Sequence, residues 1–581
     1  MNNEDNTLWI TFNGEIYNFQ EIRDALAKKN HTFRTHCDAE VIVHAYEEYG
    51  SDFLKLLNGM YAICIYDSRK KILFFARDRI GIKPLYYYCK DGRFIFASEI
   101  KAILQHNIAA SLEPKALVDY LAFQNIMDEK TFFKDIYILL PGKYLIYNLK
   151  EKKMTISTYW DADFSKARKN KTQDMRNYLT SFRKTFRDSV ERHMISNVPL
   201  GSYVSGGFDS SSITAIASEI LQAKDETARL KTFTGKFREK GCYDETPCTR
   251  VLTEKYHNKR YEVTVTPKDF LDKIEEFVYH LDEPKAGLSA ITGYCVARAS
   301  AQHVRVVLMG HGGDELFAGY PVYKSAYLRS LVRRNPLNIF KGLGMFKPSE
   351  MPRAAYYLFF PLFQKETKYG FFIVFNSIQR KKLFHPEFYR QIEKYDPVAV
   401  VKQFYDGVQD DTEGLQKLYL KAYLPSMLVV DDKVNMAHSI EGRVPFCDNA
   451  LVDFSLSTPL SAKLYNNTLK YIVKEAMKDK LPEIFYHQPK RGFPTPLSLW
   501  LRKELKQYSY DLLLSERAKS RKIFNPAYVK KLLDTHCKRK TDGLLDLVNA
   551  ARIWCLINLE IWFRIFIDQD KKLLKEVRKA R

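Results

Sequence analysis

Cysteine is scarce in this chain, and its distribution excludes a disulfide scaffold. Nine cysteines occur among 581 residues, and none stands in a CxxC pair. Small secreted domains rely on a dense and even set of cysteines, whereas this set is sparse and odd in number. The sequence therefore favours reduced thiols in a cytoplasmic protein.

Long apolar runs and a targeting segment are also absent from the sequence. The most apolar stretches, YYLFFPLF and YGFFIVF, are far shorter than the ~20 residues that a membrane-spanning helix requires. The first residues, MNNEDNTLW, lack the basic and apolar regions of a signal peptide. We expect a cytoplasmic protein with no membrane partner.

Positive charge is in excess. Lys and Arg number 91 against 69 Asp and Glu, so the net charge is +22. Such an excess raises nucleic acid as a partner. The basic residues are scattered, however, and most stand beside an acidic residue, so we expect a solvated surface and no nucleic-acid partner.

The first part of the chain has the pattern of antiparallel sheets. Length and 46% hydrophobic residues support roughly two to four domains. Residues 1–160 alternate short apolar segments with turn formers such as NG, KDGR and PGK, which is typical of antiparallel strands. Helices are expected at about 19–29 and 39–49. Residues 161–177 are polar and rich in lysine, and we interpret them as a linker.

Residues 178–581 have a different pattern. Apolar strands alternate with helices up to VRVVLMG, which predicts an α/β fold with a parallel sheet and helices on both faces. The segment at about 320–425 is helical in pattern and rich in aromatics, and we interpret it as a helical insert. The remainder is also expected to be mostly helical.

The stretch SGGFDSS has the composition of a phosphate-binding loop. It follows a predicted strand and precedes a predicted helix, so its backbone N–H groups point at whatever lies beyond the sheet edge. Gly206 and Gly207 permit a close backbone approach, and Ser205 and Ser210 add donors. Asp209 would repel phosphate unless a divalent cation lies between them, which implies Mg²⁺. The loop lacks the lysine of a Walker P-loop.

A second stretch, VRVVLMGHGGDELFAGY at residues 304–320, repeats this arrangement. An apolar strand leads into a glycine-rich turn, an acidic pair and a helix. Asp314 is therefore a candidate second metal ligand, opposite Asp209. Two such loops on neighbouring strands can hold a pyrophosphate and its metal from both sides, whereas two plain tight turns would not require an aspartate in each.

These residues carry a resemblance to a known family. SGGFDSS resembles the PP-loop of the N-type ATP pyrophosphatases, and a longer series of motifs is similar to glutamine-hydrolysing asparagine synthetase. The series runs in family order from about residue 4 to residue 502 and includes NGEIYNF, CDAEV, ARDRIGIKPLYYY, FASEIKA, VPLGSYVSGGFDSSS, GHGGDELFAGY, DDKVNMAHSIEGRVPFCD and KRGFPTPLSLW. The resemblance implies an N-terminal Ntn-hydrolase-like αββα glutaminase domain and a C-terminal PP-loop synthetase domain of the adenine nucleotide α-hydrolase-like type.

The resemblance also implies a reaction. Family members are carbon–nitrogen ligases that adenylate the side-chain carboxylate of aspartate with ATP and Mg²⁺, release pyrophosphate, and let ammonia displace AMP. The protein then mainly has to align phosphates, metal and carboxylate. Motif matching implies a pyrophosphate cradle of Ser205, Gly206, Gly207, Asp209 and Ser210, metal ligands Asp209 and Asp314, and an ATP pocket that includes Val204, Gly235, Met309 and Gly310.

Three further residues are candidates for catalysis. Lys490, in HQPKRGF, matches the catalytic lysine of the family, whose charge suits the departing phosphate. Glu441, in HSIEGRVPF, either orients substrate or base, or serves as a structural partner of Arg443. His311 departs from the family pattern, which commonly has Glu or Gln there, and Tyr in related β-lactam-forming enzymes. Its imidazole could position a carboxylate, accept a proton from the amine, or act as a neutral hydrogen-bonding substitute.

The glutamine side of the resemblance is incomplete. Asn13, Gly14, Glu15 and Asp38 match residues that bind glutamine, but the family nucleophile is a cysteine at position 2 with a free α-amine as base. This sequence begins Met-Asn-Asn, and its first cysteine is Cys37. We interpret the chain as lacking the extreme N-terminus of the glutaminase domain, through a truncated gene model in preference to a true ammonia-dependent enzyme. As written, it is expected to use ammonia.

Two other functions stay open. An amidotransferase that acts on another carboxylate, on a surface sugar or a peptide, would use the same motifs, and His311 bears on that choice. A PP-loop enzyme that modifies RNA would suit the net charge of +22, but no RNA-binding module is recognisable. The expected partners are therefore ATP, aspartate, and glutamine or ammonia, and assembly as a homodimer is left open.

Overall fold

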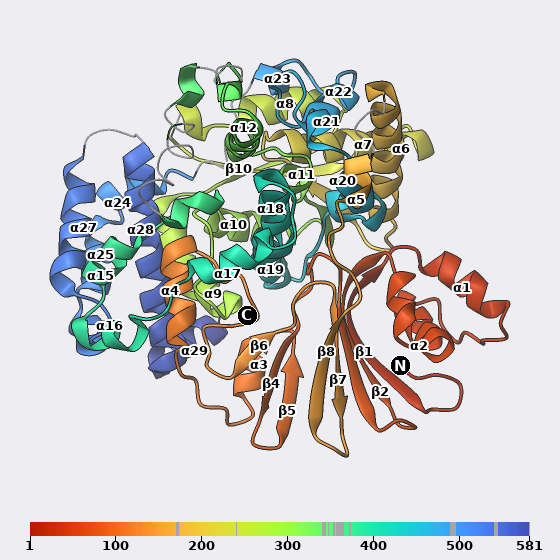
Figure 1. The fold of residues 1–581 in the computed structure, drawn as a ribbon, viewed down its shortest axis with the longest axis horizontal. Coiled ribbons are helices and arrows are strands. Elements are labelled where there is room, and N and C mark those ends of the chain that lie inside the picture. Colours follow the sequence, from red (N-terminus) through yellow and green to blue (C-terminus); the bar gives the residue numbers. More distant parts are fainter. Residues whose placement is uncertain are drawn as a thin grey trace.

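The computed structural model describes residues 1–169, 174–239, 241–339, 344–346, 348–351, 355, 365–370, 373–487, 495–539 and 544–579. The chain forms an N-terminal unit of antiparallel sheets, which is the lower part of Figure 1, and a C-terminal unit of a parallel sheet and many helices, which is the upper part.

Two antiparallel sheets pack face to face in the N-terminal unit (Figure 1). Their strand orders are β1-β2-β3-β7-β8 and β5-β4-β6. The strands are β1 (Leu8–Ile16), β2 (Gly59–Asp67), β3 (Ile72–Arg77), β4 (Tyr86–Lys90), β5 (Arg93–Ala97), β6 (Ile136–Ile138), β7 (Lys143–Asn148) and β8 (Lys153–Thr158). Strand β2 is buried on both faces, because Ala62 and Cys64 point into the core between the sheets while Ile63 and Ile65 point toward the helices.

Helices cover both outer faces of this pair of sheets. Helices α1 (Phe19–Ala27) and α2 (Asp38–Tyr49) pack on the first sheet. Helices α3 (Ile100–Leu104) and α4 (Pro114–Phe123) share a core with the second sheet. The layers are thus helix, sheet, sheet, helix, as expected, and the two early helices lie within two residues of their expected bounds.

The C-terminal unit is built on a five-stranded parallel sheet of order β11-β10-β9-β12-β13. The strands are β9 (Leu200–Tyr203), β10 (Lys231–Lys236), β11 (Lys259–Thr264), β12 (Val306–Leu308) and β13 (Glu441–Arg443). The crossovers between the first four strands are α7 (Phe208–Lys224), α8 (Thr246–Lys255), and α9 (Pro267–Leu281) with α10 (Ala290–Ser300). This confirms the predicted parallel α/β sheet with many helices.

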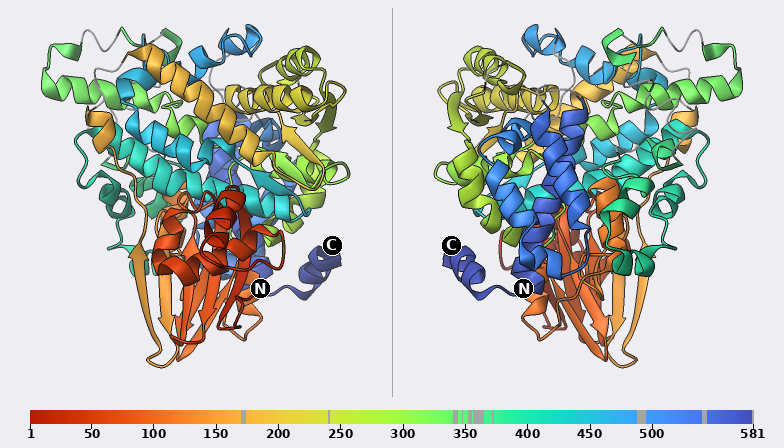
Figure 2. Two further views of the ribbon diagram at one scale, coloured as in Figure 1. Left: turned by 90° about the vertical axis from the view of Figure 1, so that its right-hand side faces the viewer. Right: turned by 90° about the vertical axis from the view of Figure 1, so that its left-hand side faces the viewer.

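The expected helical insert contains α12 (Val322–Arg334), α15 (Ser377–Leu383), α16 (Pro386–Ile392), α17 (Val398–Lys402) and α18 (Asp411–Leu418) among its described residues. Later helices include α19 (Leu424–Met436), α20 (Asn449–Ser457), α22 (Tyr471–Ala476), α24 (Leu497–Arg502), α25 (Lys506–Leu513), α26 (Glu516–Ser520), α27 (Pro526–Lys538), α28 (Leu544–Trp562) and α29 (Lys571–Lys579). Figure 2 shows α29 at the margin of the molecule, beyond the end of α28.

The segment expected as a linker is partly helical. Helix α5 (Ser165–Lys169) lies inside residues 161–177, and α6 (Met175–His193) begins before their end. Ala167 is buried, and Arg168 pairs with Glu413 of α18 at 2.7 Å. A polar composition therefore concealed a short helix that is anchored by an ion pair.

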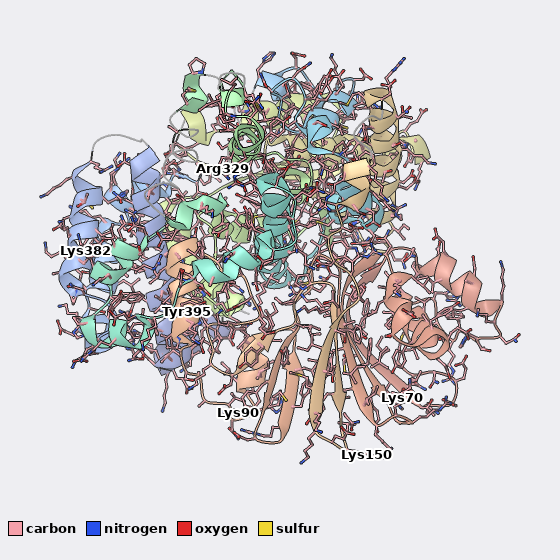
Figure 3. The ribbon with its side chains drawn as sticks, in the orientation of Figure 1. Lys70, Lys90, Lys150, Arg329, Lys382 and Tyr395 are labelled. Atoms are coloured by element: carbon pink, nitrogen blue, oxygen red, sulfur yellow. The ribbon has the colours of Figure 1, made fainter. Side chains whose placement is uncertain are left out.

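The structure also describes the cysteines, helices and basic side chains on which the exclusions from the sequence rest. The eight cysteines whose state is described are free thiols. Among the helices that the structure describes, none combines the length and apolar composition needed to cross a bilayer. Figure 3 labels Lys70, Lys90 and Lys150 at the far end of the antiparallel sheets and Lys382 on the helical side, so basic side chains occur on distant parts of the surface.

A buried ion cluster joins the two units at Asp282. Its carboxylate is fully buried and lies 2.9 Å from Nζ of Lys101 and 2.7 Å from Nζ of Lys433. The backbone N–H of Ile100 also donates to it, at 2.8 Å. Burial alone would raise the pKa of Asp282, but the two lysines outweigh burial and lower it to about 2.

We expect Asp282→Asn to lower the free energy of unfolding by roughly 3–5 kcal/mol at pH 7, because it leaves two buried ammonium groups without their carboxylate. The folded pKa lies below the ordinary value of 3.8, so this stabilisation is present above about pH 4 and is lost as the pH falls toward 2. Urea unfolding of the natural protein and the variant at pH 7 and near pH 2 measures this difference in the free energy of unfolding. Asp272→Asn, at an exposed ion pair with Lys268, is the control. Equal midpoints for the two variants at pH 7 would contradict the assignment.

Candidate active site

Two loops meet at the carboxyl edge of the parallel sheet. Strand β9 runs into residues 204–207, and its neighbour β12 runs into residues 309–312. The loops touch closely: a Cβ on Gly310 would lie 2.6 Å from the backbone N of Ser210, and one on Gly313 would lie 2.5 Å from Cγ of Asp209. Glycine is therefore required at both positions by the contact between the loops, which the sequence did not predict.

Hydroxyl and amide groups gather in the first loop, at the N-terminus of α7. The backbone N–H of Ser205 donates to Oγ of Ser210 at 3.3 Å, and the two Oγ atoms lie 3.2 Å apart. Gly206 has φ +65°, in the left-handed region that favours glycine. A helix of 17 residues directs its N-terminal N–H groups and the positive end of its dipole toward this loop, which suits an anion such as phosphate.

The two predicted metal ligands converge on one lysine. Nζ of Lys470 lies 2.6 Å from Oδ1 of Asp314 and also binds Oδ2 of Asp209. Lys470 is 4% exposed and stands at the N-cap of α22 with φ 57°. A Cβ on Gly319 would fall 2.1 Å from Cε of Lys470, so the glycine of the DELFAGY motif makes room for this lysine.

The donor set fits a divalent cation. Carboxylate oxygens are the protein ligands that Mg²⁺ prefers, and Asp209 and Asp314 already direct theirs toward a single positive charge. The sequence predicted both carboxylates but missed Lys470, which lies in no motif and is brought to the loops by a contact across 261 residues.

The residues predicted to line an ATP pocket lie at this same edge. Val204 follows β9 and donates its N–H to the carbonyl of Phe233 in β10 at 2.9 Å. Gly235 is near the end of β10, and Met309 follows β12, with its N–H donating to the carbonyl of Arg443 at 2.8 Å. The structure thus brings Val204, Gly235, Met309 and the adjacent Gly310 to the ends of neighbouring strands.

His311 pairs with an acidic residue that the sequence analysis did not identify. Its Nε2–H donates to Oδ2 of Asp431, on α19, at 2.9 Å. Its Nδ1 is buried and has no hydrogen-bond partner among the residues described. Burial lowers the pKa of His311, but the charge of Asp431 outweighs burial and raises it to about 9. At neutral pH the side chain is therefore an imidazolium beside the second loop.

Glu441 is placed differently from the other candidates. It is the first residue of β13 and lies opposite Val306 at the start of β12, whereas both loops follow the carboxyl ends of their strands. Its Oε1 accepts a hydrogen bond from Nε of Arg443 at 2.6 Å. These contacts favour the structural alternative of the two that the sequence left open. Lys490 lies outside the described residues, so its role stays a prediction.

The residues predicted to bind glutamine lie together on β1 and α2. Asn13, Gly14 and Glu15 are consecutive on β1, and Asp38 is the first residue of α2. Oδ2 of Asp38 accepts the backbone N–H of Ile16 at 2.8 Å, which fastens the helix start to the strand. Burial raises the pKa of Glu15 to about 7.

Glu15 also contacts the parallel sheet of the C-terminal unit. Oε2 of Glu15 lies 3.1 Å from a guanidinium nitrogen of Arg443, whose Nε also binds Glu441. Arg443 is almost fully buried. These ion pairs connect the predicted glutamine-binding residues to β13 of the C-terminal unit.

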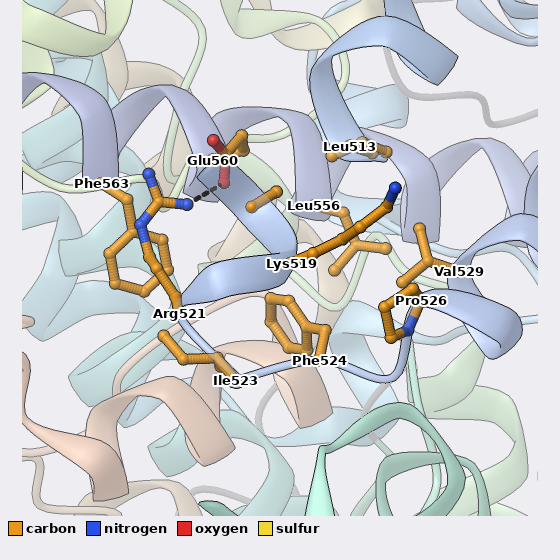
Figure 4. Close-up of a pocket in the computed structure, with 11 residues that line it drawn as sticks. Leu513, Lys519, Arg521, Ile523, Phe524, Pro526, Val529, Leu556, Glu560 and Phe563 are labelled. Atoms are coloured by element: carbon orange, nitrogen blue, oxygen red, sulfur yellow. Dashed lines mark hydrogen bonds and ion pairs between the residues drawn. The ribbon is translucent and has the colours of Figure 1, made fainter. Parts of the chain in front are cut away.

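A separate pocket lies among the C-terminal helices (Figure 4). It is formed by α26, α27 and α28 and the residues between them, and the ion pair of Arg521 with Glu560 lines it. Its described lining contains none of the predicted site residues. We therefore do not assign it to the reaction.

Comparisons with known proteins agree with the geometry. A family profile described as "Asparagine synthase" matches residues 181–564, and one described as "Glutamine amidotransferase domain" matches residues 1–160. "Asparagine synthetase [glutamine-hydrolyzing] 1" of Bacillus subtilis is 30% identical over 97% of this chain and 87% of its own length. "Putative asparagine synthetase [glutamine-hydrolyzing]" of Mycobacterium bovis is 30% identical over 97% of this chain and 85% of its own length.

A relative with a different name is also similar. "Amidase chyE" of Penicillium rubens is 26% identical and covers 87% of this chain and 80% of its own length. Because the synthase profile spans more than half of the residues and follows the amidotransferase profile, this chain belongs to the asparagine synthase family, with a glutamine amidotransferase domain at its N-terminal end.

Proposed function

We propose that the protein is an ATP-dependent amidating ligase that converts aspartate to asparagine through a β-aspartyl-AMP intermediate. AMP and pyrophosphate leave, and the nitrogen comes from glutamine or ammonia. One observation carries the proposal: two glycine-rich loops at the edge of a parallel sheet direct Asp209 and Asp314 at one cation position. Two relatives named asparagine synthetase support the choice of aspartate.

Neutral donors, carboxylates and a lysine have different roles in this proposal. Ser205, Gly207 and Ser210, at the start of α7, would turn their N–H and O–H donors to phosphate oxygens in place of the hydrogen bonds that they make with one another. Asp209 and Asp314 would hold Mg²⁺. When bound, Mg²⁺ supplies positive charge that neutralises the pyrophosphate leaving group. Lys490 is proposed to add charge at the same step, as the resemblance of HQPKRGF implies.

The choice of carboxylate depends on His311. Its pairing with Asp431 favours an imidazolium, which holds an anionic group better than it accepts a proton from an amine. This leaves a second candidate, a ligase that amidates another carboxylate. The relative named an amidase supports that candidate, since its similarity to this chain extends over most of both proteins.

A substrate panel tests the proposal. Purified protein is incubated with ATP, Mg²⁺ and either glutamine or ammonium, with aspartate or with other small and peptide carboxylates, and AMP, pyrophosphate and the amide product are measured. We expect AMP, pyrophosphate and asparagine in equal amounts with aspartate. Release of AMP only with another carboxylate would select the second candidate, and no AMP release with any carboxylate would overturn both.

We expect Asp431→Asn to change how turnover depends on pH. In the natural protein His311 stays protonated up to about pH 9, whereas without Asp431 its pKa falls to its ordinary 6.5 or below. At pH 8 the imidazolium fraction then drops to about one thirtieth or less, so turnover falls roughly 30-fold or more, and the loss is smaller at pH 6.

The control is Asp453→Asn. Asp453 lies on α20 and forms a surface ion pair with Arg79. Initial rates between pH 6 and pH 9.5 are compared for the three proteins. Profiles of the same shape for Asp431→Asn and the natural protein would show that the charge of His311 has no part in turnover.

A further inference from the structure

A second cluster of charged side chains lies in the N-terminal unit, apart from the loops of the parallel sheet. Glu4, His31, His44 and Glu47 each offer one nitrogen or oxygen, and these four atoms lie within 4.8 Å of one another. None of them is needed for the reaction proposed above. Two imidazoles and two carboxylates are a typical set of ligands for a transition-metal ion.

Three separate segments supply these side chains. Glu4 precedes β1, and His31 is in the loop between α1 and α2. His44 and Glu47 are three residues apart on α2, so they project from the same face of that helix. A bound ion would therefore fasten the segment before β1 and the loop after α1 to α2.

His44 is the observation that points to a ligand. Its side chain is 1% exposed, and neither ring nitrogen has a hydrogen-bond partner among the described residues. Its Nδ1 nevertheless lies 3.2 Å from Oε2 of Glu4, close to the carboxylate but without hydrogen-bond geometry. A buried polar group in this position is costly unless another partner satisfies it.

The spacing of the donors suits a small tetrahedral ion. With metal–ligand bonds of about 2.0–2.1 Å, two ligands of a tetrahedral Zn²⁺ ion are about 3.3 Å apart. Nδ1 of His44 and Oε2 of Glu4 are separated by 3.2 Å and already have this spacing, and the four donor atoms of the cluster lie within 4.8 Å of one another. The two carboxylates also balance the double charge of the ion. Ca²⁺ and Mg²⁺ would instead require about six oxygen ligands.

Neighbouring groups already orient the carboxylates. The backbone N–H of Thr32 donates to Oε1 of Glu4 at 3.0 Å, and Nδ2 of Asn3 donates to Oε2 of Glu47 at 3.1 Å. Such outer hydrogen bonds hold metal ligands in place and are a regular part of metal sites. Oε2 of Glu48, 3.5 Å from Nε2 of His31, adds a further negative charge at the rim.

We propose that Glu4, His31, His44 and Glu47 bind one Zn²⁺ ion that stabilises the N-terminal unit. The ion fastens the loop that leads from His31 to Asp38, the first residue of α2 and one of the candidate glutamine ligands. The site is structural, because all four positions are taken by protein ligands and none is open for a substrate. It does not depend on the proposed reaction.

The test uses untagged full-length protein that has been stripped with a chelator and dialysed. Zn²⁺ is titrated by calorimetry, and Co²⁺ is added separately to read its visible absorption, which is intense for tetrahedral sites. We expect one equivalent of Zn²⁺ to bind, a tetrahedral Co²⁺ spectrum, and a rise in Tm of several degrees. His44→Ala and His31→Ala are expected to weaken binding at least about 100-fold.

His36→Ala is the matched control, because His36 is exposed in the same loop and does not belong to the cluster. Loss of the buried His44 side chain could by itself unfold the domain. His31→Ala is therefore the second variant, since His31 lies in a loop and its loss should leave the fold intact. The proposal is overturned if the natural protein takes up less than one equivalent of Zn²⁺ at micromolar concentration. It is also overturned if His31→Ala binds as tightly as His36→Ala, which would leave the cluster as an ion-pair network only.

Discussion

Replacing Asp209 or Asp314 by asparagine is expected to lower ATP–pyrophosphate exchange by at least about 10³-fold. Both carboxylates face one cation position, and the loops that carry them are in direct contact through Gly310 and Gly313. An amide oxygen is a weaker ligand for Mg²⁺ and carries no charge, so the pyrophosphate would be left without its full counter-charge. The exchange is measured in the presence of the carboxylate substrate with which the natural protein is active.

Asp225→Asn is the control for this pair. Asp225 is exposed at the other end of α7, the helix that begins beside Asp209, so it tests for a general effect of losing one carboxylate. We expect its exchange to equal that of the natural protein. Thermal unfolding checks that all the variants are folded. If either Asp209→Asn or Asp314→Asn kept near-normal exchange with Mg²⁺ present, the metal assignment of that residue would be wrong.

The parts of this site that the sequence predicted are local. SGGFDSS and GHGGDELFAGY each place a strand end, a glycine turn and an aspartate within a few residues, so their geometry follows from short-range rules. Parallel pairing of β9 with β12 then brings the two loops together. In the same way, short apolar segments separated by turn formers in the first 160 positions sufficed to predict the antiparallel sheets of the N-terminal unit.

The parts that the sequence did not predict depend on contacts between distant segments. Asp431 meets His311 across 120 positions, and neither residue lies in a pattern that anticipates the other. The charged state of His311, and with it the preference among its three possible roles, comes only from that contact. The short helix α5 was missed for a similar reason, because the contact of Arg168 with Glu413 anchors a segment whose composition is that of a linker.

Charge also organises the junction between the two units. Arg443 binds Glu15 on one side and Glu441 on the other, while Lys83 binds Asp432 at 2.7 Å. The Lys83–Asp432 pair is buried on both sides, and a buried ion pair contributes little net stability but is costly to break on one side only. These contacts therefore help to fix how the glutamine amidotransferase domain sits on the synthase domain.

The largest effect outside the motifs is expected at Lys470. Its ammonium group is the cation between Asp209 and Asp314, so Lys470→Met leaves two carboxylates facing each other without a positive charge until Mg²⁺ binds. At an effective dielectric constant of ~20, two unit charges about 4 Å apart repel by about 4 kcal/mol. One carboxyl group is then expected to take up a proton at neutral pH, which removes it as a metal ligand. We expect exchange to fall by roughly 10²–10³-fold.

Mg²⁺ dependence separates this role from a purely structural one. Because one carboxyl group of the Lys470→Met protein is protonated at pH 7, raising the pH to 9 is expected to restore part of its exchange at high Mg²⁺, as the second carboxylate ionises. A variant that is merely misfolded would not recover. Lys478→Met is the control, since Lys478 is exposed just beyond α22 and pairs only with Glu475 among the described residues. If Lys470→Met matched Lys478→Met in exchange rate at pH 7, the ammonium group would have no part in holding the two carboxylates for the metal.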